Sequence, residues 1–296
     1  MKIGIDVGGT KTEGIIIESE GKELDRKRIH TEKNYKGTIE GIVSIINHFE
    51  NEYGKCTSIG IGMPGAISKD TALIKNANSV WLNGKAFKKD LEKKLNRKIN
   101  LANDANCFAL SEAIDGAGKD GKIVFGVILG TGVGGGIVVD KKILEGKNSI
   151  CGEWGHIPLP NRTEEEKKYV KDCYCGKIGC METYISGPGF ASCFNLKNKK
   201  NFDSHKIIDG YLKNDQNCID AIKMYVDHFA RGLSVVCNII DPDIVVLGGG
   251  MSNIEYIYDN IDEAMAKYIF SDTFNTKVVK NIHGDSGGVR GAAWLS

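Results

Sequence analysis

Hydrophobic residues follow two different spacings along the chain, and the two spacings alternate. Runs of β-branched and other apolar residues predict strands at 2–6, 12–17, 23–30, 58–63, 99–101, 124–129, 137–139 and 244–247. Apolar residues three and four positions apart predict helices near 37–53, 104–112, 219–239 and 285–295. Alternating strands and helices are typical of an α/β protein in which helices cover the sheets.

Glycine-rich connections join two of the predicted strand pairs. Gly8-Gly9-Thr10-Lys11 joins the first pair, and the segment 130–136 joins a second pair further along the chain. Each of these hairpins opens one half of the sequence. The repetition predicts a duplicated domain with a cleft between the two copies.

Composition and charge exclude several classes of protein. A chain of 296 residues suffices for about two domains. Its 39 Lys and Arg against 38 Asp and Glu leave a net charge of +1. The sequence therefore has no excess of positive charge that would attract nucleic acid or an anionic membrane. Its 37 Gly but only 5 Pro show that the glycine excess is not ordinary loop composition.

Neither a secretory leader nor a membrane span is visible in the sequence. Met1-Lys2 leads at once into a strand pattern that contains Asp6, and the long uncharged stretch 123–139 is short and rich in glycine. We therefore expect a cytoplasmic protein with no membrane partner. The nine cysteines are an odd number with one tight cluster, which in a reducing compartment favours a metal site over disulfides.

The first glycine turn has the composition of a phosphate-binding site. Adjacent glycines let backbone N–H groups approach an anion, a neighbouring threonine and lysine add donors, and a preceding aspartate suits Mg²⁺. The alternative is an ordinary hairpin turn, and the spacing matches neither a Walker A loop nor a dinucleotide fingerprint. The candidate residues are Asp6, Gly8, Gly9, Thr10 and Lys11.

Two more glycine-rich turns follow predicted strands. Glycines also serve close packing, but four of the five positions at 132–136 are glycine, which is more than packing usually requires. Three such turns at strand ends favour a nucleoside triphosphate. The candidates are Gly130, Thr131, Gly132, Gly134, Gly248, Gly249 and Gly250.

Asn103-Asp104 stands between a predicted strand and a predicted helix. An aspartate at this place is often only a helix N-cap. The functional alternative is a general base that accepts a proton from a hydroxyl while its oxygen attacks a γ-phosphate. Phosphoryl transfer depends mostly on positioning and charge neutralisation, so one carboxylate with Mg²⁺ and phosphate-binding turns is a sufficient set.

His156 and a cluster of three cysteines predict a metal site. One imidazole and three thiolates match a closed tetrahedral Zn²⁺ site, which is structural and not hydrolytic because no coordination position stays open. The candidate ligands are His156, Cys173, Cys175 and Cys180, and the remaining cysteines at 56, 107, 193, 218 and 237 are expected to be buried thiols. Glu153 and Glu182 stand beside these ligands and suit the vicinal hydroxyls of a polyol, although each alone is more often a surface carboxylate.

These motifs together resemble the ROK family (repressors, open reading frames, kinases) over nearly the whole chain. The resemblance is carried by Asp6-Val-Gly-Gly-Thr-Lys11, Glu153-x-Gly-His156 and Cys173-x-Cys-Gly-x-x-Gly-Cys-x-Glu182. It implies a two-domain α/β fold of the hexokinase/actin-like (ribonuclease H-like) type, with ATP and Mg²⁺ in an interdomain cleft and one Zn²⁺. It also implies an N-terminal domain of 1–117 plus about 283–296, a C-terminal domain of 118–282, and a homodimer.

The resemblance assigns roles to individual residues. Asp104 corresponds to the catalytic base, and the three glycine turns would surround ATP. The sugar contacts correspond to Gly65, Asn78, Asn103, Asp104, Glu153, His156 and Glu182. His156 would thus serve both the zinc and the sugar.

The expected function is an ATP-dependent hexose kinase that acts on the C6 hydroxyl. The segments 76–84, 103–112 and 152–160 look most like bacterial fructokinases (mannofructokinases), and Trp81, Trp154 and Pro158 favour fructose. The segment 103–112 is also similar to bacterial N-acetylglucosamine kinases, so N-acetylglucosamine, N-acetylmannosamine and glucose are alternative acceptors.

A sugar-responsive transcription repressor of the same family is the alternative from another class. It is disfavoured because only five residues precede Asp6 and no helix-turn-helix element is visible.

Overall fold

The computed structural model describes residues 1–295 and divides into two compact units. Unit 1 comprises Met1–Asp120, Gly136–Cys151 and Ile282–Ser296, and unit 2 comprises Gly121–Gly135 and Gly152–Asn281. The segment Gly136–Cys151 therefore falls in unit 1, whereas the sequence-based boundary placed it in the second domain. Ser296, the last residue of the predicted C-terminal segment, lies outside the described residues.

Unit 1 is built on a five-stranded sheet in the order β3-β2-β1-β4-β7. The first three strands are antiparallel neighbours, whereas β4 and β7 run parallel to β1. Their bounds are β1 Lys2–Val7, β2 Lys11–Ile17, β3 Glu23–His30, β4 Ser58–Met63 and β7 Asn100–Asn103. The minor strands of this unit are β5 Ala66–Ile67, β6 Ile74–Lys75 and β10 Lys142–Ile143.

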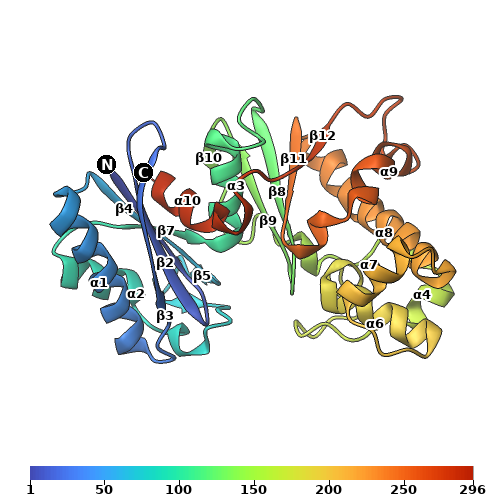
Figure 1. Cartoon of the computed structure of the whole chain (residues 1–296), viewed down its shortest axis with the longest axis horizontal. Helices are drawn as coiled ribbons and strands as arrows, with labels where there is room; N and C mark the ends of the chain where they lie inside the picture. The colour runs from blue at the N-terminus through green and yellow to red at the C-terminus, as the bar shows by residue number, and fades with distance from the viewer. Residues whose placement is uncertain (296) are drawn as a thin grey trace. The chain divides into compact units, whose positions relative to one another are not determined.

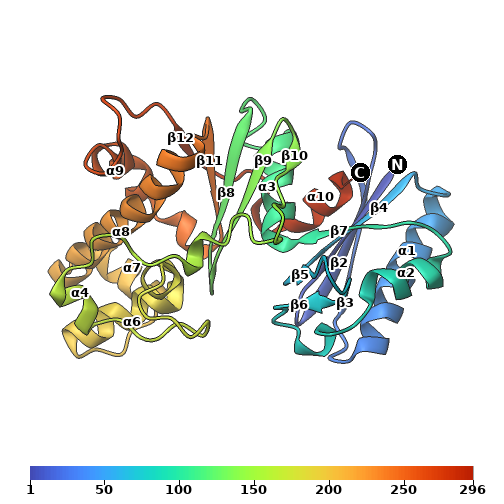
Figure 2. The ribbon, with the colours of Figure 1, turned by 180° about the vertical axis from the view of Figure 1, so that it is seen from behind.

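Helices cover both faces of the first sheet (Figures 1 and 2). On one face lie α1 and α2, and on the other lie α3 and α10. The apolar stripe of α1, which includes Ile42, Ile46 and Phe49, is fully buried against the sheet because its residues recur at helical spacing. The bounds are α1 Tyr35–Tyr53, η1 Val80–Leu82, α2 Phe87–Leu95, α3 Asp104–Asp115, η4 Gly284–Ser286 and α10 Gly287–Trp294.

The C-terminal helix α10 packs on the backbone of β1 and β4 through glycines. A Cβ atom at Gly4 would lie 2.2 Å from the carbonyl oxygen of Val289, and one at Gly60 would lie 1.8 Å from that of Ala292. Glycine is thus required at both positions because a helix backbone approaches them closely. The Lys2 ammonium also lies 4.6 Å from the centre of the Trp294 ring, so the two ends of the chain meet in unit 1.

The second sheet repeats the strand order of the first. Its order is β10-β9-β8-β11-β12, with β11 parallel to both β8 and β12. The bounds are β8 Ile123–Leu129, β9 Val133–Val139, β11 Ile244–Gly248 and β12 Lys277–Lys280, and the division between the units falls within β9. Both sheets thus consist of an antiparallel edge followed by parallel strands, as expected for a duplicated domain.

The long helix α8 buries many of its residues in the core of unit 2. Trp154 packs edge-on between Phe125 of β8 and Phe229 of α8, with ring centroids 5.6 and 6.0 Å away. The helices are η2 Trp154–His156, α4 Glu164–Lys168, α5 Glu182–Ile185, α6 Gly187–Asn198, α7 Ser204–Leu212, α8 Gln216–Ile240, η3 Gly250–Asn253 and α9 Glu255–Met265.

The predicted glycine turn at 130–136 is shorter than expected. Strand β9 already begins at Val133, so only Gly130, Thr131 and Gly132 form the connection. A Cβ atom at Gly135 would lie 2.8 Å from the Gly152 carbonyl oxygen, so this glycine serves close packing.

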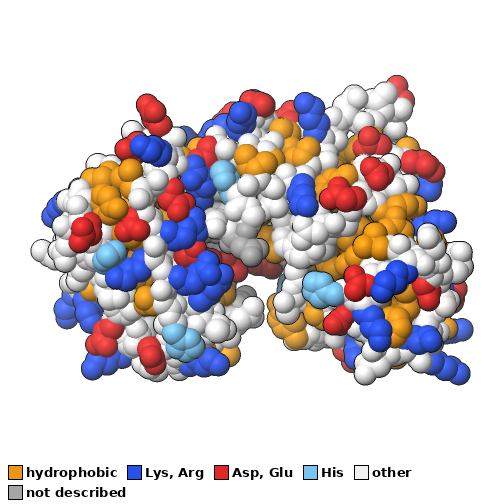
Figure 3. Space-filling view, viewed as in Figure 1, with side chains coloured by type: hydrophobic (Ala, Val, Ile, Leu, Met, Phe, Trp, Pro, Cys, Tyr) orange, Lys and Arg blue, Asp and Glu red, His pale blue; other side chains and the backbone are white. Residues whose placement is uncertain are grey.

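Among residues 1–295, the helices are too short or too polar to cross a bilayer. Lys and Arg side chains are interspersed with Asp and Glu side chains over the face in Figure 3, in keeping with a net charge of +1.

Candidate functional site

The candidate residues of unit 1 follow the carboxyl ends of its parallel strands. Asp6 of β1 pairs with Gly62 of β4, and Met63 of β4 pairs with Asn103 of β7. Parallel neighbours end at one edge of a sheet, so Asp6 and the Asn103-Asp104 pair lie along the same edge. Ligands of open α/β sheets bind at this carboxyl edge.

Asn103 caps the helix and leaves the carboxylate of Asp104 exposed. Asn103 Oδ1 accepts a hydrogen bond of 2.9 Å from the backbone N–H of Ala105, and its Nδ2 donates one of 3.1 Å to the carbonyl oxygen of Gly65. Asp104 is the first residue of α3 and also accepts from the Ala105 N–H. The N-cap role therefore belongs to Asn103, which fixes the place of its acidic neighbour.

Asp6 is a partly buried carboxyl close to Asp104. Its two oxygens lie beside Gly62 and Gly288, where the absence of side chains makes room for them. Burial, followed by the negative charge of Asp104, raises the pKa of Asp6 to about 7. A bound divalent cation would offset the repulsion between these two carboxyl groups.

The predicted sugar contacts Gly65 and Asn78 lie on a tightly folded connection. Gly65 has φ of +82°, and a Cβ atom there would lie 2.5 Å from the carbonyl oxygen of Lys75. Asn83 brackets Ala77 by accepting from its N–H at 2.9 Å and donating to its carbonyl at 3.0 Å. The side chain of the adjacent Asn78 stays exposed.

A pocket of about 280 Å³ in unit 1 adjoins Gly65 and Asn103. Asn106, one turn after Asn103 on α3, also lines this pocket. Its Oδ1 atom is buried and has no hydrogen-bond partner within residues 1–295. The sequence analysis missed Asn106, although its position three residues after Asn103 places both on one helix face.

The first glycine turn presents its backbone to solvent. The Gly8 N–H donates to the Lys11 carbonyl at 3.0 Å and closes the turn, while Gly9 and Thr10 are exposed between them. The Lys11 ammonium is half-exposed and lies 3.9 Å from Glu13. This turn therefore offers both N–H groups and a cation to an anion.

The two glycine turns of unit 2 lie side by side. A Cβ atom at Gly249, whose φ is +82°, would lie 2.5 Å from the Leu129 carbonyl oxygen. The N–H of Gly187, at the first position of α6, donates 2.8 Å to the Gly130 carbonyl. Two turns and a helix N-terminus thus meet at the carboxyl ends of β8 and β11, where backbone N–H groups favour phosphate.

The four predicted metal ligands come together in unit 2. The donor atoms of His156, Cys173, Cys175 and Cys180 all lie within 4.8 Å of one another. Cys175 Sγ lies 3.6 Å from Cys180 Sγ, and Cys173 Sγ lies 3.6 Å from His156 Nδ1. Thiolates on tetrahedral Zn²⁺, with Zn–S bonds of about 2.3 Å, are roughly 3.8 Å apart, so this donor set fits zinc.

Tyr174, between two of these ligands, holds the second nitrogen of the imidazole. Its hydroxyl lies 3.0 Å from His156 Nε2. Partial burial, followed by the carboxylates of Glu182 and Glu153, raises the pKa of Tyr174 to about 12, so its hydroxyl stays protonated at neutral pH. The sequence analysis missed Tyr174 because residues between metal ligands are usually spacers.

The two tryptophans that favoured fructose are engaged in packing. The Trp154 indole N–H donates 3.0 Å to the carbonyl oxygen of Gly134, and its side chain is buried. The Trp81 indole N–H donates 3.0 Å to Thr38 Oγ1. Their presence is therefore explained by the fold and does not distinguish one sugar from another.

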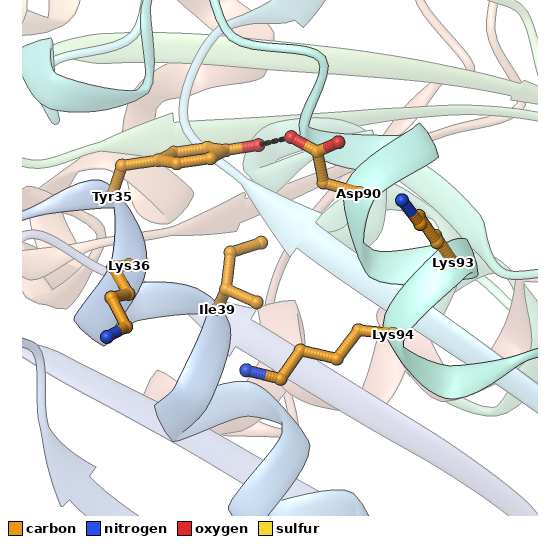
Figure 4. A pocket seen from close by; sticks show the side chains of 6 residues that line it. All are labelled: Tyr35, Lys36, Ile39, Asp90, Lys93 and Lys94. Carbon is orange, nitrogen blue, oxygen red and sulfur yellow. Dashed lines mark hydrogen bonds between the residues drawn. The ribbon is translucent and has the colours of Figure 1, made fainter.

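A separate pocket of about 450 Å³ lies between α1 and α2 (Figure 4). The Tyr35 hydroxyl donates 2.6 Å to Asp90 at its rim. Lys36 and Lys94 both lie within 4 Å of Glu40, which offsets their charge. None of the predicted site residues lines this pocket.

The chain matches known proteins over its whole length. It is 36% identical over 299 residues to an N-acetyl-D-glucosamine kinase of Vibrio parahaemolyticus, with 100% of this chain and 99% of that protein covered. It is 38% identical over 304 residues to the enzyme of the same name from Aliivibrio salmonicida, with the same coverage. The ROK hexokinase of Thermus thermophilus superimposes with a TM-score of 0.88 at 25% identity, over 100% of this chain and 98% of that one.

These matches confirm the expected two-domain hexokinase/actin-like α/β fold. The model of the ROK family matches residues 2–296. The family model and the relatives in sequence thus indicate the same family as the structural match, and the chain belongs to the ROK family.

Proposed function

We propose that this protein is an ATP-dependent sugar kinase that phosphorylates the C6 hydroxyl of a hexose. The observation that carries the proposal is the exposed Asp104 carboxylate, fixed by Asn103 at the carboxyl edge of the unit 1 sheet and close to Asp6. The curated relatives with 36% and 38% identity are sugar kinases by name, which supports the same reaction.

Asp104 acts as the general base in this proposal. Its carboxylate accepts the proton of the C6 hydroxyl while that oxygen forms a bond to the γ-phosphorus of ATP. The bond from the γ-phosphorus to the bridging oxygen breaks, and ADP leaves. The exposure of Asp104 supports this role because a base must reach a hydroxyl of a bound ligand.

ATP and Mg²⁺ suit the turns and carboxylates already described. Asp6 would hold Mg²⁺ through water, and the ion would neutralise charge on the phosphates. The phosphate donors in unit 1 would come from the turn at Gly8, Gly9, Thr10 and Lys11. In unit 2, the nucleotide contacts would come from Gly130, Thr131, Gly132, Gly134, Gly248, Gly249 and Gly250.

The remaining roles concern the sugar and the zinc. In unit 1, Gly65, Asn78 and Asn103 would contact sugar hydroxyls together with Asp104. In unit 2, Glu153, His156 and Glu182 would do so. Zinc on His156, Cys173, Cys175 and Cys180 would hold the imidazole and the loop before Glu182 in place, because a metal-bound histidine has a fixed ring orientation.

Two observations favour different acceptors. The segments that resemble fructokinases, and Pro158 within them, favour fructose, which remains the first acceptor of this proposal even though Trp81 and Trp154 no longer support it. The relatives are named N-acetyl-D-glucosamine kinases and do not support that choice, so N-acetylglucosamine is the second candidate.

A coupled assay of ADP release tests the function and the acceptor together. Fructose, mannose, glucose, N-acetylglucosamine and N-acetylmannosamine are compared at equal concentration, and the phosphorylated carbon of each product is located by NMR. We expect one acceptor to dominate kcat/KM and to carry its phosphate at C6. ADP release that no sugar stimulates would contradict the kinase assignment.

A further inference from the structure

Tyr174 makes a hydrogen bond that a substrate hydroxyl needs. Its hydroxyl lies 3.0 Å from His156 Nε2, and the two rings stand nearly at right angles with centroids 5.2 Å apart. The other imidazole nitrogen, Nδ1, lies 3.6 Å from Cys173 Sγ and faces the metal ligands. Nε2 is therefore the one nitrogen of His156 that faces away from the metal ligands.

The phenol is hydrogen-bonded to one side chain that the proposed function assigns to the sugar, and the charges of two others act on it. The carboxylates of Glu182 and Glu153 both interact electrostatically with Tyr174, and His156 is its hydrogen-bond partner. A phenolic hydroxyl and a sugar hydroxyl each combine one O–H donor with an oxygen acceptor, so they suit the same set of partners.

The Tyr174 side chain is free to turn away while its backbone stays in place. The residue is 78% exposed. Two backbone hydrogen bonds close the loop that contains Tyr174. The Cys173 N–H donates to the Lys177 carbonyl at 2.9 Å, and the Gly176 N–H donates to the Cys173 carbonyl at 2.9 Å. A rotation about the side-chain bonds suffices to release His156 Nε2.

We propose that Tyr174 is an internal competitor of the sugar for His156 Nε2, and therefore a residue that sets substrate affinity and selectivity. The inference rests on the proposed function. A sugar binds His156 only after it has displaced the phenol, so the apparent affinity is reduced by the fraction of molecules in which Tyr174 holds the imidazole. A sugar that offers no hydroxyl to Nε2 forms no hydrogen bond in place of the one between Tyr174 and His156, so it should bind more weakly.

Removal of the phenol oxygen tests the inference. In Tyr174→Phe, the ring stays but cannot hydrogen-bond to His156. The Kd for the preferred hexose should therefore fall about threefold to tenfold, which is the effect of one modest hydrogen bond. Calorimetry without nucleotide measures this Kd. Tyr174→Ala should shift the Kd in the same direction. Tyr169→Phe, on the neighbouring segment of unit 2, is the matched control and should leave the Kd unchanged.

Zinc content is measured for each variant, since an intact metal site shows that the loop has kept its structure. A Kd that is unchanged or higher in a zinc-loaded Tyr174→Phe variant overturns the role of Tyr174, even if the protein remains a sugar kinase. Failure of every hexose to bind both the wild type and the variant instead rejects the proposed function, and the competition with it.

Discussion

The Oε2 atom of Glu182 accepts a hydrogen bond of 2.9 Å from the backbone N–H of Val133. Glu182 begins α5, two residues after the metal ligand Cys180, and Val133 begins β9 directly after the glycine turn. A Cβ atom at Gly132 would lie 2.8 Å from the same carboxylate oxygen, so glycine is needed there to admit the contact. One side chain thus connects the metal loop to a turn that we assign to ATP.

This connection predicts that two substitutions of Glu182 have different effects. Glu182→Gln keeps an oxygen acceptor for the Val133 N–H but loses the charge, so the sugar KM should rise while the ATP KM stays nearly constant. Glu182→Ala leaves that N–H unpaired, so both KM values should rise, that for ATP by about threefold to tenfold. Steady-state kinetics with each substrate varied in turn give both values.

Glu153→Ala is the control for this pair. Glu153 is exposed and precedes η2, so its removal should raise the sugar KM alone. An ATP KM that is the same in Glu182→Ala and the wild type would show that the bond to Val133 does not support the nucleotide turn.

The pKa of Asp6 makes stability depend on pH. The folded protein raises this pKa from 3.8 to about 7, so between these values it holds a proton that the unfolded chain has released. The free energy of unfolding therefore decreases as the pH rises from about 4 to about 7, because the folded state must then ionise a partly buried carboxyl group. Asp6→Asn should therefore raise Tm at pH 8 by more than at pH 5. Differential scanning calorimetry of protein free of metal and nucleotide measures this, and equal shifts at both pH values would refute it.

Removal of the zinc should loosen the loop that ends at Glu182. We expect about one zinc per chain by elemental analysis, since all four ligands are contributed by one unit. A strong chelator or Cys175→Ser should lower Tm by several degrees and raise the sugar KM, because binding energy of a structural metal contributes to folding. Cys237→Ser, a buried thiol outside the cluster, serves as the comparison for zinc content. Absence of zinc from active protein would exclude the metal site.

The glycine contacts under α10 predict a strong effect of one methyl group. Gly60→Ala places a Cβ atom 1.8 Å from the Ala292 carbonyl oxygen, so helix and sheet must separate. We expect a loss of at least about 2 kcal/mol in the free energy of unfolding, as for overpacked cores. Gly41→Ala in α1, where the new Cβ meets only the end of Ile29, should be neutral or stabilising. Equal stabilities of the two variants by urea denaturation would argue against this close packing.

The fold was predictable where one sequence pattern dominates. The apolar spacing from Ile39 to Phe49 predicted α1, and strands at Glu23–His30 and Ser58–Met63 have the predicted bounds. The helix α2 was missed although Phe87, Leu91 and Leu95 stand at helical spacing, because the short segment is otherwise made of charged residues. Strand β12 was missed for a similar reason, since Val278 and Val279 are its only apolar residues.

The candidate site was predictable from residue types but not from local geometry. The cysteine spacing indicated the metal cluster, which the structure brings together. The glycines at 134, 135 and 136 were misread as part of a turn, although they lie in strand β9. Pattern alone does not separate a glycine that binds a ligand from one that permits packing, as those at 135 and 136 do. The bond from Tyr174 to His156 depends on how the loop folds back, which the spacing of ligands does not specify.

The central claim is that the Asp104 carboxylate accepts the proton of the sugar hydroxyl. Asp104→Asn keeps the size and polarity of the side chain but removes the base, so kcat should fall by about 10²- to 10⁴-fold while the Kd for the sugar stays within about twofold of the wild type. Rapid-quench measurement of a single turnover, with zinc content and sugar binding checked on the same sample, is the most direct test. Turnover close to that of the wild type in a variant that binds sugar normally would contradict the account.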